Sequence, residues 1–406
     1  MPHHRKRYLE NNLNITLNYS PIIGILGHRQ VGKTTLLESI CNQYISLDSK
    51  IILKSAKQDP EGFITKLKEK SKGLVGIDEC QIEPGLFPAL KEHVRKNKTP
   101  GQFLLSGSVR FTSRQAIRES LTGRILNFEL LPFTIDELGH RPLKNSCHEA
   151  LCSSSLERFF KRPKTTLSAL QLYVKEMNAY FELGGLPGIC FVKDMRIRKI
   201  KLEEQLRTLL DRDLRLVQKT TLALQDIRSL CVFLANTQGE PIDYSQLQKE
   251  IGISFPTLKK LFFALEAIFL IRSIPIEGGR KGHVVFFEDQ GEANWLRFDP
   301  PSAEDNLKHF CFTNIRAQFE YRLGQKTETF HYRTRGGALI PFAFRNKEGV
   351  LGVIPLGDTS KLEKALGSAN SFLKTYLNSK VLILHTGQDR RLFQSRLLLA
   401  PVAEFV

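Results

Sequence analysis

Short apolar runs that end in polar or glycine-rich residues divide the first 140 residues of the chain. Residues 21–26, 73–79 and 101–105 have the length and near-continuous apolar character of strands buried in a parallel sheet. Residues 50–53 form a shorter run that we also interpret as a strand, and residues 60–70 have the charged amphipathic pattern of a helix. This alternation predicts an α/β unit with a parallel sheet.

The pattern changes after residue 140. Residues 140–166 are polar and predict a loop with one short helix, which links the first unit to a helical lid. Amphipathic helices are predicted at residues 226–235 and 244–251, and a third follows a tight turn with Ser254 as its N-cap. A strand at residues 269–274 completes a winged helix-turn-helix, which either reads DNA or packs on a neighbouring domain. The outward residues of the third helix are Thr257, Lys259 and Lys260.

Strands and helices alternate again from residue 283 to residue 406, which predicts a second α/β unit. We expect helices at residues 306–323 and 361–377. The strands that we expect are residues 284–287, 328–333, 338–344, 350–356 and 381–384.

Gly27 begins the sequence G-x-x-x-x-G-K-T between the first predicted strand and a helix that we expect to run to about Tyr44. Such a strand–loop–helix arrangement is typical of the P-loop. Its backbone N–H groups enclose a polyphosphate, Lys33 reaches the β- and γ-phosphates, and the Thr34 hydroxyl binds Mg²⁺. The alternative is a glycine-rich turn without a ligand. The predicted nucleotide-binding residues are Gly27, His28, Arg29, Gln30, Val31, Gly32, Lys33, Thr34 and Thr35.

Two acidic residues end the apolar run at residues 73–79. A buried parallel strand brings Asp78 to the edge of the sheet at which ligands bind, and there Asp78 would share Mg²⁺ with Thr34. Glu79 would orient and deprotonate an attacking water as a general base. The alternative is a strand that stops at a polar turn.

Hydroxyl and arginine side chains follow the next predicted strand. Ser106 and Ser108 could contact the γ-phosphate or the water, which is a sensor role. Arg124 could act as a catalytic residue with Lys33 and Glu79 by stabilising transition-state charge, in its own subunit or a neighbouring one. The alternative for Arg124 is a surface residue in a turn.

The chain has 406 residues, too many for one hydrophobic core, so we expect two or three domains. A net charge of +17 and a pI of about 9.5 favour contact with nucleic acid or another anionic surface; the alternative is that this charge only maintains solubility. Seven cysteines without a C-x-x-C pair indicate reduced thiols. We find no apolar run of membrane-spanning length and no secretory signal, so we expect a cytoplasmic protein without membrane contact.

The segments GHRQVGKTTLL, GIDECQIEPGLFPALKEHV, FLLSGS, ESLTGRI and LLPFTIDEL, with the later segments FELGGLP and DRDL, occur in this order. Together they resemble a family of prokaryotic AAA+-like P-loop ATPases that carry a winged helix and a C-terminal domain related to restriction nucleases. The resemblance implies ATP binding and hydrolysis. It also implies an ATPase core (residues 1–140), a helical lid or linker (141–220), a winged helix-turn-helix (221–277) and a degenerate nuclease-like α/β domain (278–406). His28 stands where the family usually has proline, but that position contributes backbone, so we expect nucleotide binding to survive.

The resemblance also implies a place for a nuclease site, with one acid on a strand and an E-x-K on the next strand to hold Mg²⁺. Here those places, and that of a helix acid, are taken by Pro341, Pro355, Gly357 and Thr313. Because these residues offer no carboxylate, we expect no nuclease activity. A shift of the alignment by one strand would bring Asp358 and Lys361 near the site instead.

The sequence therefore predicts an AAA+-like ATPase that hydrolyses ATP with Mg²⁺ to drive or switch domain movement. Candidate partners are nucleic acid, a second copy of the chain and another protein. The alternative is an ATP-switched DNA- or protein-binding regulator that does not hydrolyse ATP.

Overall fold

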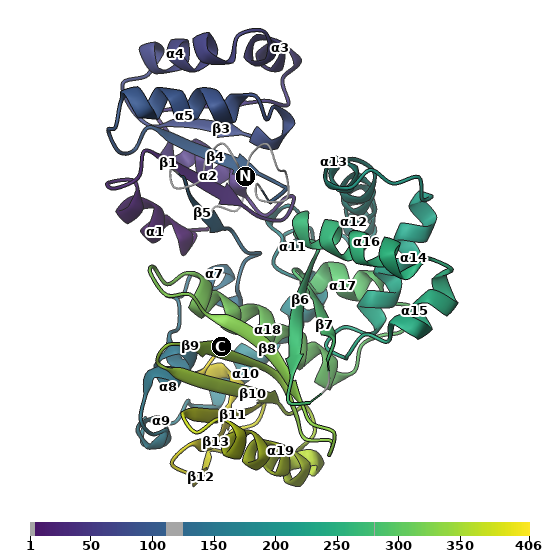
Figure 1. Cartoon of the computed structure of the whole chain (residues 1–406). Coiled ribbons are helices and arrows are strands. Elements are labelled where there is room, and N and C mark those ends of the chain that lie inside the picture. Colours follow the sequence, from purple (N-terminus) through teal and green to yellow (C-terminus); the bar gives the residue numbers. More distant parts are fainter. Residues whose placement is uncertain (1–4, 111–124, 280) are drawn as a thin grey trace.

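A computed structural model describes residues 5–110, 125–279 and 281–406 (Figure 1). Its first sheet has five parallel strands in the order β2-β3-β4-β1-β5. These strands are β1 (Ile22–Leu26), β2 (Gln43–Ser46), β3 (Val75–Asp78), β4 (Phe103–Gly107) and β5 (Ile125–Glu129). Because β4 lies between β1 and β3, the residues that follow β4 emerge between the predicted P-loop and Asp78. The strands expected near residues 21–26, 73–79 and 101–105 are confirmed by β1, β3 and β4.

Helices cover both faces of this sheet. Ile22 on β1 belongs to the core beneath α4 and α5, whereas the adjacent Ile23 packs with α1 and α2, as alternation along a strand requires. The elements are α1 (Leu9–Thr16), α2 (Lys33–Ile40), α3 (Lys50–Gln58), α4 (Pro60–Lys70), the 3-10 turn η1 (Cys80–Ile82), α5 (Leu86–Lys96) and α7 (Ile135–Leu138).

The strand predicted at residues 50–53 is wrong, because these residues open helix α3. Three consecutive apolar residues do not separate a strand from a helix, and here Ile51 is 84% exposed. The strand is instead β2, within a region that we expected to be helical up to Tyr44. Helix α2 ends at Ile40, and residues 43–46 then pair with β3.

Residues 140–166 contain two short helices instead of the expected one, α8 (Ser146–Cys152) and α9 (Glu157–Phe160). With α10 (Leu167–Leu183), they pack on the C-terminal part of the chain. Leu151 and Tyr173 share a hydrophobic core with Phe310 and Leu351. This stretch is therefore part of the C-terminal unit rather than a link to a lid.

A helical unit (residues 195–267) lies beside the first sheet in Figure 1. After α11 (Pro187–Cys190), it comprises α12 (Met195–Thr208), the π-helix η3 (Leu209–Asp213), α13 (Leu214–Val217), α14 (Leu224–Asn236), α15 (Tyr244–Ile251) and α16 (Phe255–Ala267). Leu209 and Leu214 belong to one core with Ile227 and Leu258. The π-helix is therefore packed in one core with α13, α14 and α16. The predicted helices at residues 226–235 and 244–251 are confirmed, and Ser254 precedes α16 without a side-chain capping bond.

The second sheet has eight strands in the order β12-β13-β11-β10-β9-β8-β6-β7. They are β6 (Ile271–Glu277), β7 (His283–Phe287), β8 (Glu328–Arg333), β9 (Leu339–Asn346), β10 (Gly349–Pro355), β11 (Ser379–His385), β12 (Arg391–Gln394) and β13 (Leu397–Pro401). The β6–β7 hairpin follows the helical unit and joins this sheet through the parallel pairing of Ile276 with His331. A boundary between residues 277 and 278 thus falls inside a hairpin of one continuous sheet.

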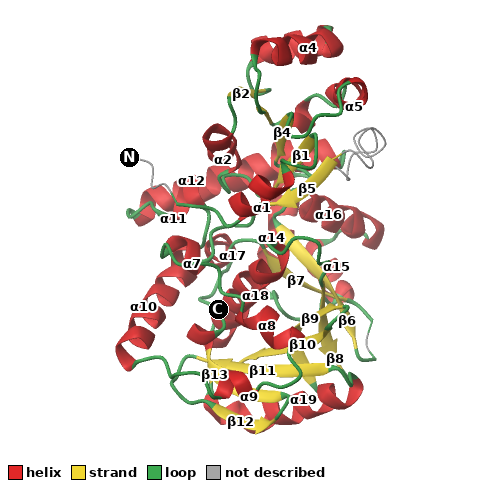
Figure 2. Ribbon diagram, turned by 90° about the vertical axis from the view of Figure 1, so that its left-hand side faces the viewer, coloured by secondary structure: helices red, strands yellow, loops and turns green. Residues whose placement is uncertain are grey.

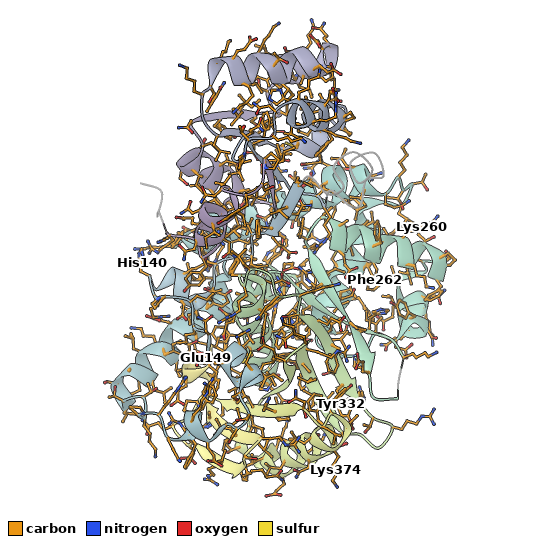
Figure 3. The ribbon with its side chains drawn as sticks, turned by 60° about the vertical axis from the view of Figure 1, so that its left-hand side comes forward. His140, Glu149, Lys260, Phe262, Tyr332 and Lys374 are labelled. Atoms are coloured by element: carbon orange, nitrogen blue, oxygen red, sulfur yellow. The ribbon has the colours of Figure 1, made fainter. Side chains whose placement is uncertain are left out.

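This second sheet lies between two helical layers, as Figure 2 shows. Phe372 of α19 packs on one face, while Phe312 of α18 packs with α8 and α10 on the other. The elements are α17 (Gln290–Leu296), α18 (Ala303–Glu320), the turn η4 (Thr359–Lys361), α19 (Leu362–Thr375) and the turn η5 (Val402–Glu404). Tyr332 on β8 is among the largest fully buried side chains of this core (Figure 3).

The residues considered for a nuclease site lie on several elements of the C-terminal part of the chain. Pro341 is within β9, Pro355 ends β10 and Thr313 is in the middle of α18. Asp358 is exposed and caps the turn at Ser360, while Lys361 forms an ion pair with Glu304. No cluster of three or more metal-ligating His, Cys, Asp or Glu side chains occurs among the described residues.

A buried ion cluster joins the two sheets. Arg272 on β6 contacts Glu129 on β5 and lies 2.9 Å from Glu288, which also pairs with Arg316 of α18. Burial alone would raise the pKa of Glu288, but the guanidinium groups of Arg272 and Arg316 lower it below its ordinary value. The cluster therefore keeps buried charges paired across the junction.

All seven cysteines are free thiols, in agreement with the reduced state expected from their spacing. In the described part of the chain, every helix is too short or too polar to traverse a lipid bilayer.

Candidate functional site

The loop after β1 has two glycines, each required for a different reason. A Cβ on Gly27 would lie 2.4 Å from the carbonyl oxygen of Leu130, so only glycine allows this close approach. Gly32 has a φ of 97°, a backbone conformation that residues with a side chain avoid, and it precedes α2 as its N-cap. The loop consequently turns back on itself and directs the N-terminus of α2 inward.

Lys33 extends back over this loop. Its Nζ donates to the carbonyl oxygens of Gly27 at 2.9 Å and His28 at 2.8 Å, and the side chain is buried. Burial lowers the pKa of Lys33, an effect that the nearby carboxylates of Glu79, Asp78 and Asp213 oppose. The ammonium group is thus held where incoming phosphate oxygens could replace the two carbonyl oxygens.

Asp78 accepts hydrogen bonds from hydroxyl groups on α2, β2 and β4. Thr34 at the start of α2 donates to Oδ2 at 2.6 Å, Tyr44 of β2 donates to the same oxygen at 3.0 Å, and Ser106 of β4 donates to Oδ1. The order of the strands places Ser106 of β4 beside Asp78 of the neighbouring β3. Carboxylate and hydroxyl oxygens are the ligands that Mg²⁺ prefers, so Thr34 and Asp78 fit this ion.

Glu79 adopts the left-handed conformation, with φ 57° and ψ 39°, which is unusual for a residue other than glycine. Its carboxylate accepts a hydrogen bond from Gln81 Nε2 and lies 3.4 Å from the Ser108 hydroxyl. Burial raises the pKa of Glu79, while the charge of Lys33 opposes this increase. A carboxyl group with a raised pKa is well suited to accept a proton from water.

Two acidic residues from outside the first sheet reach the P-loop, and we did not predict them from the sequence. Glu292 of α17 lies 3.0 Å from His28 Nε2, and Asp213 of η3 lies 3.5 Å from Arg29 Nη1. Both carboxylates are fully buried. The DRDL segment that includes Asp213 was the only sequence signal; the position of Glu292 gave none.

Arg7 from the N-terminal segment was also missed as a site residue. Its Nη1 donates to the carbonyl oxygen of Val31 at 2.7 Å, its Nε pairs with Glu137 at 3.1 Å, and its guanidinium lies 4.4 Å from the centroid of the Phe133 ring. The N-terminal segment thereby fixes the P-loop backbone at Val31.

A cavity of about 550 Å³ lies next to the P-loop. Lys33, Thr34 and Glu79 line its polar end, and Phe133 and Phe191 contribute aromatic surface elsewhere. The other lining residues are Arg5, Arg7, Glu10, Arg29, Gln30, Gly32, Thr35, Leu36, Ser39, Pro187, Gly188, Val192 and Lys201. A cavity with a cationic polar end and an aromatic wall has the character of a small-molecule site.

The structure brings most of the predicted site residues together, with two exceptions. Arg124 lies outside the described residues, and the Val31 side chain is buried in the core under the loop. His28 does more than contribute backbone, because its side chain is buried against Glu292. Ser106 and Ser108 have different partners: Ser106 contacts Asp78, whereas Ser108 contacts Glu79 and Asp213.

The family model of the AAA domain matches residues 19–139, the part of the chain that forms the first sheet and the P-loop. This match supports a P-loop ATPase fold for this part of the chain, which we refer to as the AAA domain. A second model, described as a domain of unknown function (DUF8612), matches residues 174–277, from α10 through the helical unit to β6.

Two curated relatives, both described as uncharacterized proteins, come from Mycobacterium bovis and Mycobacterium tuberculosis. Each is 24% identical over 273 residues, which is 64% of this chain and 51% of the relative. The chain thus spans about half the length of the curated relatives it matches.

Among solved structures, a STAND signal-transduction ATPase with a tetratricopeptide repeat sensor from Pyrococcus horikoshii shares 14% identity, with 77% of this chain and 47% of that chain covered. An Hsp104–ADP complex from S. cerevisiae shares 13% identity, with 77% and 42% covered. Both have a TM-score of 0.27, which is too low for the similarity to support an argument.

Proposed function

We propose that this protein binds ATP with Mg²⁺ at the P-loop, hydrolyses it to ADP and phosphate, and uses the cycle to drive or switch movement of the helical unit against the AAA domain. The observation that carries the proposal is the set of hydrogen bonds that Thr34 and Ser106 donate to Asp78, next to the buried Lys33. A structural turn would not need a buried lysine beside two hydroxyls that donate to one carboxylate, with Lys33 and Thr34 lining a cavity.

Each group has a distinct role in this proposal. Lys33 exchanges the Gly27 and His28 carbonyl oxygens for phosphate oxygens. Thr34 and Asp78 would hold Mg²⁺, which neutralises phosphate charge when bound. Glu79 accepts a proton from the attacking water, while Gln81 donates to its Oε2 and orients the carboxylate. Ser106 and Ser108 act as sensors, and Arg124 supplies positive charge from its own subunit or from a second copy.

The test measures phosphate release and retention of labelled ATP on the same preparations. Wild type should release phosphate in the presence of Mg²⁺. Glu79→Gln should retain ATP but hydrolyse it more slowly by a factor of about 100 or more, as expected for loss of a general base. Lys33→Ala should lose ATP binding. Wild-type protein that neither binds nor hydrolyses ATP would refute the proposal.

A non-hydrolysing regulator is the alternative, and one observation favours it. Gln81 donates to Oε2 of Glu79 and Ser108 lies 3.4 Å from the same oxygen, and hydrogen bonds to the charged carboxylate make it a weaker base for a proton from water. If wild type and Glu79→Gln bind ATP equally and neither releases phosphate, this alternative holds.

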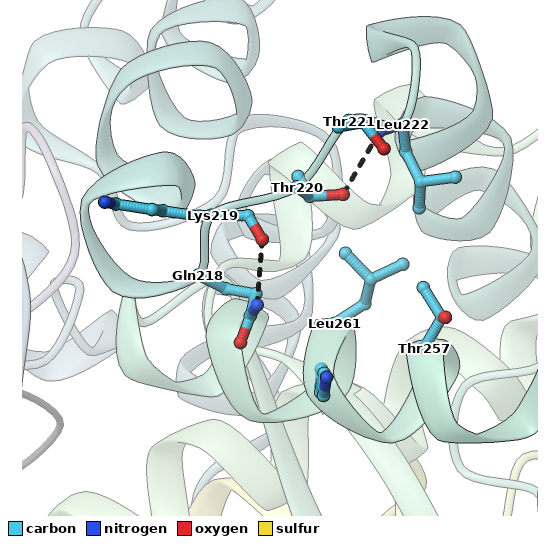
Figure 4. Close-up of a pocket in the computed structure, with 8 residues that line it drawn as sticks. Gln218, Lys219, Thr220, Thr221, Leu222, Thr257 and Leu261 are labelled. Atoms are coloured by element: carbon cyan, nitrogen blue, oxygen red, sulfur yellow. Dashed lines mark hydrogen bonds between the residues drawn. The ribbon is translucent and has the colours of Figure 1, made fainter.

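We propose duplex DNA as the leading macromolecular partner, bound through the helical unit as a winged helix-turn-helix. Lys260 is exposed on α16, whereas its neighbour Phe262 is buried in the core (Figure 3). A pocket of about 390 Å³ lies between α16 and the loop at residues 218–222 (Figure 4). Thr257 and Lys260 contribute polar lining, and Lys219 lies on the opposite loop. Lysine and threonine side chains commonly contact phosphate groups of DNA.

DNA binding would be measured by titration of fluorescent duplex at several salt concentrations. Lys260→Ala should weaken binding and lower the salt dependence, whereas Lys374→Ala on α19 should change neither.

We further propose a homo-oligomer or a complex with a protein partner, and a cytoplasmic location. We also propose that the C-terminal domain does not cut nucleic acid; metal-dependent nicking of a plasmid would contradict this.

A further inference from the structure

The segment that carries Asp213 belongs to the helical unit and not to the AAA domain. Asp213 ends the π-helix η3, and the adjoining Leu209, Leu210 and Leu214 are buried in the core of the helical unit. A π-helix is rare and is found mostly at functional sites. The Asp213 carboxyl group is fully buried, which raises its pKa while the charge of Arg29 opposes the increase, so its position needs an explanation beyond surface solvation.

Asp213 contacts two residues that line different sides of the proposed ATP site. Ser108 lies 3.3 Å from Oδ2 and Arg29 Nη1 lies 3.5 Å from the same oxygen. Arg212 on the same element lies 3.8 Å from Oδ1. Ser108 in turn is 3.4 Å from Glu79 and accepts a hydrogen bond from Gln81 at 3.0 Å. A continuous chain of contacts thus joins Glu79 to Arg29 through Asp213.

The Ser108 hydroxyl has one proton, and the carboxylates of Glu79 and Asp213 both lie within reach of it. When Ser108 donates to Asp213, it cannot donate to Glu79, whose Oε2 then keeps the hydrogen bond from Gln81 alone among these two and is the stronger base. The same Asp213 oxygen holds the Arg29 guanidinium at the cavity wall beside Lys33. The Asp213 carboxylate of the helical unit therefore orients Arg29 directly and influences Glu79 through Ser108.

We propose that Asp213 is a positioning residue for ATP hydrolysis, which acts through Ser108 and Arg29 and completes the site only while the helical unit is docked on the AAA domain. The inference rests on the proposed function and extends it, because it names the residue through which the position of the helical unit sets the hydrolysis rate. Nucleotide binding itself does not require Asp213, since Lys33 and Thr34 come from the P-loop.

The test compares Asp213→Asn with Asp211→Asn, a matched change on the same π-helix. Asp211 is exposed and pairs with Arg215 at 3.2 Å, outside the ATP site. Asp213→Asn should lower kcat by about 100-fold, the scale expected when catalytic groups are misplaced by an ångström. The KM for ATP and the retention of labelled ATP should stay close to wild type, and Asp213→Glu should recover part of kcat. Asp211→Asn should match wild type.

Two results would overturn the inference: a wild-type kcat for Asp213→Asn, or a fall in its ATP binding that accounts for the whole loss of rate. If Asp213→Asn does not fold, Arg29→Gln replaces it, and a wild-type kcat in that variant overturns the inference equally. Absence of hydrolysis in wild type would instead refute the proposed function, so the two failures are distinguishable.

Discussion

The carboxylate of Glu292 lies 3.0 Å from Nε2 of His28, and both side chains are almost completely buried. The other ring nitrogen of His28, Nδ1, lies 2.7 Å from the carbonyl oxygen of Arg29. An acceptor oxygen lies beside each ring nitrogen, and this arrangement favours the doubly protonated, positively charged imidazole. Burial would lower the pKa of His28, but the Glu292 charge and hydrogen bonds outweigh it and raise this pKa above its ordinary value of 6.5.

This pair predicts that stability depends on pH above neutrality. Because the pKa of His28 is higher in the folded protein, the pair contributes fully below pH 6.5, and its contribution is lost as pH rises through the raised pKa. Urea unfolding from roughly pH 6 to 9 should therefore show a falling free energy of unfolding in wild type.

A double variant separates this pair from other titrating groups. His28→Gln/Glu292→Gln replaces the pair with two neutral amides, so its unfolding free energy should lack the component of the decline that belongs to His28. The single variant His28→Gln leaves Glu292 buried without a cation and should lose about 3 kcal/mol at neutral pH. Parallel pH profiles for wild type and the double variant would contradict the assignment of a charged His28.

The hydrogen bond from Thr34 to Asp78 predicts a specific defect in metal use. Thr34→Ala removes one oxygen of the pair that would hold Mg²⁺, while Asp78 and the P-loop backbone remain. The Mg²⁺ concentration for half-maximal phosphate release should rise on the order of tenfold, the effect of losing a group that supports a metal. Thr65→Ala on the exposed side of α4 is the control and should leave the curve unchanged. Identical curves for the two variants would rule out Thr34 as a Mg²⁺ ligand.

Local motifs allowed most of the AAA domain to be predicted, because a glycine-lysine loop after an apolar strand determines its own geometry. The contacts that couple domains were not predictable from local pattern. Glu292 and His28 are in contact but lie 264 positions apart in the sequence, and Asp213 and Arg29 lie 184 positions apart. Neither separation corresponds to a local pattern that would predict the contact. The apolar run at residues 50–53 was misassigned because strand and helix give the same signal over so few residues.

The close approach of Gly27 to Leu130 predicts that a single methyl group disrupts the P-loop. In Gly27→Ala the new Cβ would lie 2.4 Å from a backbone oxygen, which cannot move as a side chain would. We expect a loss of about 1–3 kcal/mol in unfolding free energy and of ATP binding. Gly367→Ala in α19 has no atom within 4 Å of its new Cβ and should instead be stabilised, by about 0.5–1 kcal/mol. Equal stability of the two variants in urea would contradict the steric argument.

The ion cluster at the junction of the two sheets predicts that Arg272 is critical for stability. Arg272→Met would remove the guanidinium that contacts both Glu129 and Glu288 and leave Arg316 to face both carboxylates, which should cost about 3 kcal/mol in unfolding free energy. Arg196→Met is the matched control, because the Arg196 side chain is 90% exposed and its pair with Asp194, at 3.7 Å, should contribute at most about 1 kcal/mol. Urea unfolding of both variants measures the difference. If Arg272→Met loses no more unfolding free energy than the control, other contacts stabilise the junction, and the two sheets do not depend on this cluster to stay together.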